Sequence, residues 1–173
     1  TSQLVEGTKI IIANKTSEVA AGALSSSYLT SVSATFENDT IESSNALKFT
    51  LGKSGSYYTF TNDNQLLGCT GEKKLTFSGG TTTWNITVNT DGTCKVTPSS
   101  GTSNGHLQYN SSAPRFTTYK SSQQAVSLYA ASEAKSYSTL DDVLAVSGNV
   151  SYIKIIELLN NCLDGENTSA LKI

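Results

Sequence analysis

One short segment, from Leu107 to Tyr119, brings together side chains that suit the binding of polar ligands. Its candidate binding residues are Tyr109, Asn110, Arg115 and Tyr119. Tyrosine presents an apolar ring face beside a hydroxyl group, and arginine adds a rigid set of donors, so these groups can stack on a sugar and bond its hydroxyls. A structural alternative stays open, in which Arg115 bonds neighbouring carbonyls and the tyrosines pack the rim of a barrel.

The residues that usually perform catalysis do not form a recognisable set. His106 is the only histidine, and its neighbours supply no nucleophile with an orienting carboxylate. Several acidic residues stand in turn-like contexts, where backbone geometry explains them: Asp39, Glu42, Asp63, Glu72 and Asp91. One histidine without a Cys-x-x-Cys pair does not make the usual zinc site. The sequence therefore predicts that the protein is not an enzyme and needs no cofactor or metal.

The composition narrows the class of protein. Only 15% of the 173 residues are charged and the net charge is −2, so no nucleic-acid footprint is present. No apolar run approaches the roughly 20 residues of a membrane span. Low charge with abundant Ser, Thr, Asn and Gly is typical of extracellular modules, and we predict a secreted or cell-surface protein. The sequence has no methionine, and we expect a fragment whose partners include other domains of a longer chain.

The cysteines leave two alternatives open. There are three of them, so one disulfide would leave one thiol free. Cys69 and Cys94 are expected on neighbouring strands, where they form either a bridge or two small buried apolar side chains.

Alternation of apolar and polar residues predicts the elements that position the candidate site. Trp84, Ile86 and Val88 alternate with polar residues, which is the period of a half-buried strand. Asp91-Gly92 follows as a hairpin turn, because glycine tolerates positive φ. Four or five short strands fill the stretch from Trp84 to Tyr129, and similar patterns precede it.

The same plan occurs three times along the chain. Each unit opens with a glycine and a short apolar strand, after Gly7, Gly55 and Gly92. A leucine marks the middle strand of each unit, at Leu29, Leu67 and Leu107. An aromatic residue marks the third strand, at Phe36, Phe77 and Phe116. An alternating strand closes each unit, at Phe49 and Leu51, at Trp84 to Val88, and at Val126 and Leu128.

Three four-strand units predict an all-β fold, a β-trefoil-like small barrel over residues 1–131. Six strands would form the barrel and six would form hairpins that cap it, so that closure removes exposed sheet edges. A two-sheet sandwich or another small barrel is the alternative.

The remaining residues, 132–173, predict a short C-terminal helical appendage or the start of a following region. One helix is expected from Leu140 to Val146, and a second from Val150 to Leu163 with a broad apolar stripe. Such a stripe must be covered, either by the barrel, by a second copy in self-association, or by another domain.

The third unit also resembles a known family. The run HLQYNSSAPRFTTYKSSQQAVSLY follows the pattern L-x-Y-N-x-S-x-P-R-F-x-x-Y and then Q-x-V-x-L-Y. It is similar to the closing part of a β-rich accessory domain in secreted multidomain proteins of gut bacteria, and the resemblance extends over about residues 4–130. The resemblance implies a bacterial, exported, noncatalytic module, and it fixes neither a ligand nor any catalytic residue.

The repeat, the low charge and the Tyr-, Asn- and Arg-containing third unit together predict a lectin-like function. We expect a noncatalytic secreted binding module, an accessory domain whose ligand is a glycan. The alternative is a structural spacer or assembly domain of a larger surface protein, with the helix from Val150 to Leu163 as its contact element.

Overall fold

The computed structural model describes residues 4–37 and 40–131, and this part of the chain is all-β, as the alternation predicts. It contains one 3-10 turn, η1 (Thr102–Asn104), and no α-helix. The predicted helical appendage of residues 132–173 lies outside the described residues. The strands are β1 (Lys9–Asn14), β2 (Val19–Ser25), β3 (Tyr28–Ser33), β4 (Thr35–Glu37), β5 (Thr40–Glu42), β6 (Lys48–Ser54), β7 (Tyr57–Asn62), β8 (Gln65–Leu66), β9 (Gly68–Gly71), β10 (Lys74–Thr76), β11 (Trp84–Val88), β12 (Cys94–Pro98), β13 (His106–Asn110), β14 (Arg115–Tyr119) and β15 (Ser127–Ala130).

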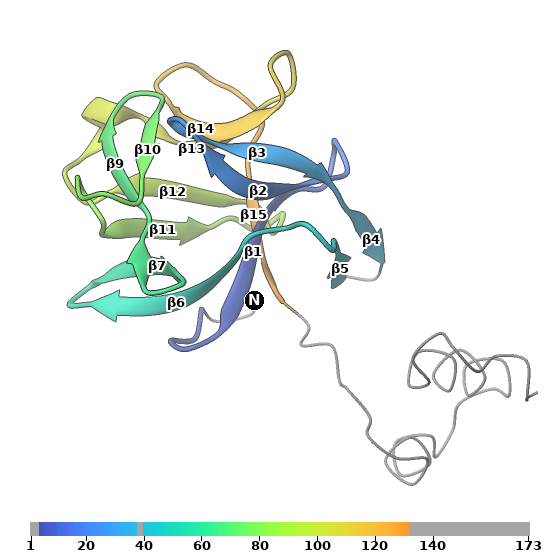
Figure 1. Cartoon of the computed structure of the whole chain (residues 1–173), viewed down its shortest axis with the longest axis horizontal. Coiled ribbons are helices and arrows are strands. Elements are labelled where there is room, and N and C mark those ends of the chain that lie inside the picture. Colours follow the sequence, from blue (N-terminus) through green and yellow to red (C-terminus); the bar gives the residue numbers. More distant parts are fainter. Residues whose placement is uncertain (1–3, 38–39, 132–173) are drawn as a thin grey trace, which may run out of the picture. The chain divides into compact units, whose positions relative to one another are not determined.

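Six of these strands pair in a closed cycle (Figure 1). β1 pairs with β6 and with β15, and β7 pairs with β6 and, at Trp84 and Tyr58, with β11. β12 pairs with β11, and Cys94 on β12 forms a bridge with Val126, next to the start of β15. Every member of the cycle thus has a neighbour on both sides, so the cycle itself presents no open edge for another chain to extend.

Three hairpins join consecutive members of the cycle, and they meet one another. They are β2–β3, β9–β10 and β13–β14. β14 pairs with β3, and Leu75 on β10 donates its backbone N–H to the carbonyl of Ser27, at 2.8 Å. In Figure 1 the β9–β10 hairpin lies on the side of the molecule away from β5, and its strand β10 contacts β3 and β14. Each unit therefore contributes two cycle strands and one of these three hairpins.

The predicted unit starts agree with this arrangement. Gly7, Gly55 and Gly92 all have positive φ, at 86°, 59° and 82°. The first cycle strand of each unit begins two residues after its glycine, at Lys9, Tyr57 and Cys94. The glycine thus turns the chain at the same place in each unit.

Three of the residues that were expected to mark inner strands lie elsewhere. Leu29 lies on β3 directly opposite Phe116, so it belongs to the third strand of its unit rather than the second. Phe36 lies in an additional hairpin, β4–β5, and Phe77 follows the last residue of β10. The additional hairpin lengthens the first unit and displaces the pattern there, which explains why an alignment by apolar residues alone misassigns Leu29 and Phe36.

The apolar run at the start of the chain is buried on both faces. Ile10 and Ile12 join the main core, whereas Ile11 and Ala13 join a second cluster with Ile41. This second cluster lies under the additional β4–β5 hairpin, where the rings of Phe36 and Tyr129 meet edge to face at 5.4 Å. A strand with both faces covered needs no polar alternation, which accounts for three successive isoleucines.

The cysteines adopt one of the two expected forms. Cys69 and Cys94 are both free and buried, at 1% and 4% exposure. Burial raises the pKa of the Cys94 thiol. Both residues therefore act as small core side chains.

Candidate functional site

A pocket of about 190 Å³, the hairpin pocket, opens where the three hairpins meet, and residues of all three units line it. The turn between β2 and β3 supplies Ser27, the first residue of β3 is Tyr28, and the turn between β9 and β10 supplies Lys73. The third hairpin supplies the rest of the lining: Asn110, Arg115, Thr117 and Tyr119.

Three of the four residues expected from the sequence line this pocket, and the fourth does not. Asn110, Arg115 and Tyr119 are in the lining, and Tyr119 is itself only 3% exposed. Tyr109 is only 4% exposed, and its ring packs against Phe116 at 4.8 Å between centroids. Adjacent residues of a strand face opposite sides, so Tyr109 and Asn110 are separated by the sheet. Tyr109 therefore serves the core and is not available to a ligand in the pocket.

Four lining residues were not expected, and three of them come from other units: Ser27, Tyr28 and Lys73. The guanidinium carbon of Arg115 lies over the ring of Tyr28, 5.1 Å from its centroid. The ammonium nitrogen of Lys73 lies over the ring of Tyr119, 5.6 Å from its centroid. Each cation is thus held against an aromatic face that a different unit provides. No motif in the sequence marks Tyr28 or Lys73, because only the meeting of the hairpins brings them to the pocket.

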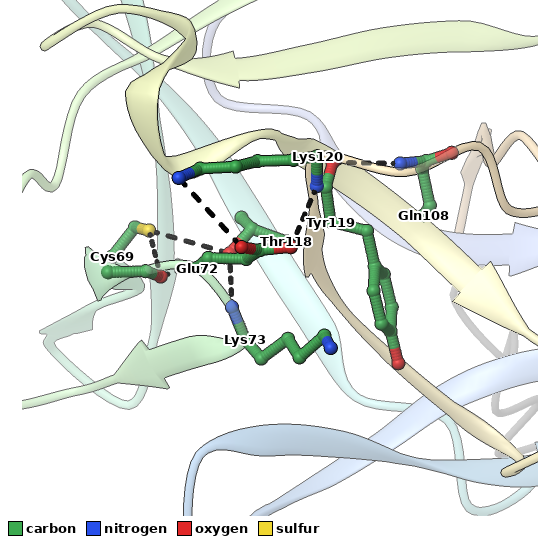
Figure 2. A network of polar contacts seen from close by, with 8 residues as sticks. Cys69, Glu72, Lys73, Gln108, Thr118, Tyr119 and Lys120 are labelled. Carbon is green, nitrogen blue, oxygen red and sulfur yellow. Dashed lines mark hydrogen bonds and ion pairs between the residues drawn. The ribbon is translucent and has the colours of Figure 1, made fainter.

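A polar network fixes the β9–β10 turn to β14, as Figure 2 shows. The backbone N–H of Lys73 lies 2.9 Å from the carbonyl oxygen and 3.2 Å from the hydroxyl of Thr118. The Thr118 hydroxyl donates in turn to the carbonyl of Gly71, at 3.2 Å. The Glu72 carboxylate accepts the backbone N–H of Lys120 at 3.1 Å and pairs with its ammonium group at 3.9 Å. These bonds place Lys73 beside Tyr119.

Buried Gln108 holds the end of β14 in the same way. Its amide nitrogen donates to the carbonyl of Tyr119 at 3.0 Å and to that of Ser121 at 3.1 Å. Its carbonyl oxygen accepts the backbone N–H of Gln123 at 2.7 Å. A buried amide with its donors and acceptor engaged stabilises one geometry, so the backbone that carries Tyr119 is well defined.

The side-chain oxygen of Asn110 forms hydrogen bonds within the hairpin turn, while its side-chain nitrogen has no hydrogen-bond partner among the described residues. Its side-chain oxygen accepts the backbone N–H groups of Ser112 and Ala113, at 3.0 and 3.1 Å, which shapes the hairpin turn. Its side-chain nitrogen makes no hydrogen bond within the described part of the chain. Arg115 donates from Nε to the carbonyl of Ala113 at 3.2 Å, as the structural alternative expected, and its two terminal nitrogens stay without such a partner there.

The lining determines what the pocket can do chemically. Lys73 and Arg115 are its charged residues, and neither a carboxylate nor a histidine lines it. Among the residues described, no cluster of three or more His, Cys, Asp or Glu side chains could hold a metal ion. Within the same ranges, no helix is long and apolar enough to cross a membrane. The arrangement is suited to recognition through hydrogen-bond donors and positive charge.

A larger hollow, of about 850 Å³, lies along β15 and the Asp91-Gly92 turn. None of the candidate residues lines it. Its walls mix apolar side chains such as Ile10 and Leu128 with turn residues, and Lys15 and Asp91 are its charged members. Its uncharged polar members include Asn89, Thr93 and Ser127.

His106 lies outside both lined spaces, and we expect it to affect stability rather than function. Burial, and then the charge of Lys95, lower its pKa below the ordinary value of 6.5. The unfolded chain therefore binds a proton first as the pH falls, and stability decreases from about pH 6.5 down to the lower folded pKa. Urea titrations between pH 4.5 and 7.5 should show a smaller decrease for His106→Asn. An identical pH profile for both proteins would contradict this.

Comparison with known proteins gives the fold and no family. No protein-family model matches the sequence, and no curated protein matches it. A chain of the Haemophilus ducreyi cytolethal distending toxin crystal structure is similar over 79% of this chain and 94% of its own, with 13% identity and a TM-score of 0.51.

Two further solved structures are similar at lower scores. SeviL bound to asialo-GM1 saccharide matches 72% of this chain and 98% of its own, with 17% identity and a TM-score of 0.48. The Macrolepiota procera ricin B-like lectin in complex with lactose matches 76% and 92%, with 13% identity and a TM-score of 0.44.

Proposed function

We propose that residues 4–131 form a β-trefoil and act as a noncatalytic glycan-binding module of a secreted or cell-surface protein. Support for the trefoil comes from the closed cycle of six strands and from the three hairpins that meet beside it. Support for the location is the low charge of the chain and its resemblance to exported accessory domains.

The observation that carries the binding proposal is the hairpin pocket. The ring of Tyr28 and a set of donors that include Asn110 and Arg115 converge on it from separate units. A sugar offers an apolar ring face and a ring of hydroxyls, so it needs both an aromatic surface and convergent hydrogen-bonding groups. No carboxylate or histidine stands beside the hydroxyl groups of the lining, which favours binding over turnover.

A glycan microarray tests the proposal, with Tyr28→Ala as the informative variant. Removing the Tyr28 ring takes away part of the pocket wall and the support of Arg115, so we expect retention of the bound glycan to fall at least about tenfold. Tyr57→Ala is the matched control, because Tyr57 is an exposed tyrosine on β7 and does not line the pocket. Retention of no glycan by the native protein, or equal loss in both variants, would contradict the proposal.

A further inference from the structure

The charge in the hairpin pocket is positive and is not neutralised by the described residues. Lys73 and Arg115 contact aromatic faces, and neither forms an ion pair within the described part of the chain. Glu72, the acid next to Lys73, is engaged by the backbone and the ammonium group of Lys120. The net charge of the whole chain is −2, so this positive group is a local feature.

We propose that the pocket binds the anionic group of an acidic glycan, either a carboxylate or a sulfate; this inference rests on the proposed glycan-binding function. The terminal nitrogens of Arg115 present a planar pair of donors, which matches the oxygens of a carboxylate or sulfate. The ammonium group of Lys73 and the amide nitrogen of Asn110 are further donors in the same lining. A neutral sugar would leave two cations without a counter-charge.

The fixed positions of the two cations strengthen this argument. Tyr28 and Tyr119 hold the long side chains of Arg115 and Lys73 over their rings, without the neutralisation that a carboxylate would bring. An anion then meets donors that have already lost much of their conformational freedom, so less free energy is spent on ordering them. The polar network under Lys73 serves the same purpose, because it fixes the backbone of the β9–β10 turn.

The size of the pocket limits what enters it. At about 190 Å³ it is smaller than the roughly 300–1,000 Å³ of sites that enclose a whole drug-sized ligand. We therefore infer that one acidic unit at the end of a glycan enters the pocket, while the rest of the glycan extends over the surface.

An array of matched glycans tests this with the full chain. Each neutral glycan, lactose among them, is printed beside its sialylated and its sulfated form, which separates carboxylate from sulfate. We expect at least one acidic form to bind about tenfold or more tightly than its neutral parent. Lys73→Gln and Arg115→Gln should each lower the ratio of acidic to neutral binding about tenfold, because a hydrogen bond to a charged group is lost.

Lys53→Gln is the matched control, because Lys53 also lies over a tyrosine ring, that of Tyr58 at 5.0 Å, but does not line the pocket. It should bind as the native protein does. Equal binding of neutral and acidic forms, unchanged in Lys73→Gln and Arg115→Gln, would overturn the anion site and leave glycan binding intact. Binding of no form at all would instead overturn the proposed function.

A titration with sodium sulfate tests the anion site without any assumption about the glycan. Nuclear magnetic resonance of the ¹⁵N-labelled protein should show saturable shifts of the Arg115 Nε–H and of the Lys73 amide. Arg115→Gln should abolish the saturable shift of Lys73, whereas Lys53→Gln should preserve it. Shifts that are absent, or that rise linearly with salt across the surface, would overturn the proposal.

Discussion

Replacing Trp84 by alanine is expected to lower the free energy of unfolding by about 3–5 kcal/mol. The side chain is fully buried, and its ring meets Phe60 edge to face at 6.0 Å. Its indole N–H donates to the carbonyl of Leu67 at 3.0 Å. Trp84 is also the residue at which β11 pairs with Tyr58 of β7. The substitution would therefore leave a cavity at the contact that joins β7 to β11 in the strand cycle.

Two further variants separate the causes of this loss. Trp84→Phe keeps an aromatic ring but leaves the carbonyl of Leu67 without its donor, and we expect it to cost about 1–3 kcal/mol. Thr87→Ala, at an exposed position of the same strand, should change stability by no more than about 0.5 kcal/mol. Trp84 is the only tryptophan, so urea unfolding must be followed by circular dichroism. A Trp84→Ala protein within about 1 kcal/mol of the native protein would contradict the packing described here.

Much of the fold could be predicted from local sequence patterns. The alternation at Trp84 and the glycines at the start of each unit are readable because they depend on neighbouring residues. The pairing of β7 with β11 could not be predicted in this way, because it joins residues that are far apart in the sequence and consists of a single residue pair, Trp84 with Tyr58. The additional β4–β5 hairpin was also missed, since its short strands look like any turn-rich segment.

The candidate site shows the same division between local and long-range information. Asn110, Arg115 and Tyr119 belong to one hairpin, so a single segment of sequence reveals them. Tyr28 and Lys73 belong to two other hairpins, and only the folded structure brings them next to the residues of the third hairpin. Tyr109 alternates in step with buried Leu107, so the sequence pattern places the two side chains on the same face.

Gly105→Ala should destabilise the protein by about 2–5 kcal/mol, because two penalties coincide at this position. Gly105 has a φ of 75°, which L-residues rarely adopt. A Cβ added there would lie 2.1 Å from the carbonyl oxygen of Tyr119 and 2.6 Å from the backbone nitrogen of Lys120. These are backbone atoms, so β13 and β14 would have to separate where His106 pairs with Tyr119.

Gly92→Ala is the control that isolates the second penalty. Gly92 has a similar φ of 82°, but a Cβ there would meet nothing within 4 Å, so only the backbone cost of about 1–2 kcal/mol applies. Urea unfolding of both variants measures the difference, and equal stabilities would contradict the close approach at Gly105. Because Tyr119 lies on the displaced strand and supports Lys73, any folded Gly105→Ala protein should also lose the preference for acidic glycans, whereas Gly92→Ala should keep it.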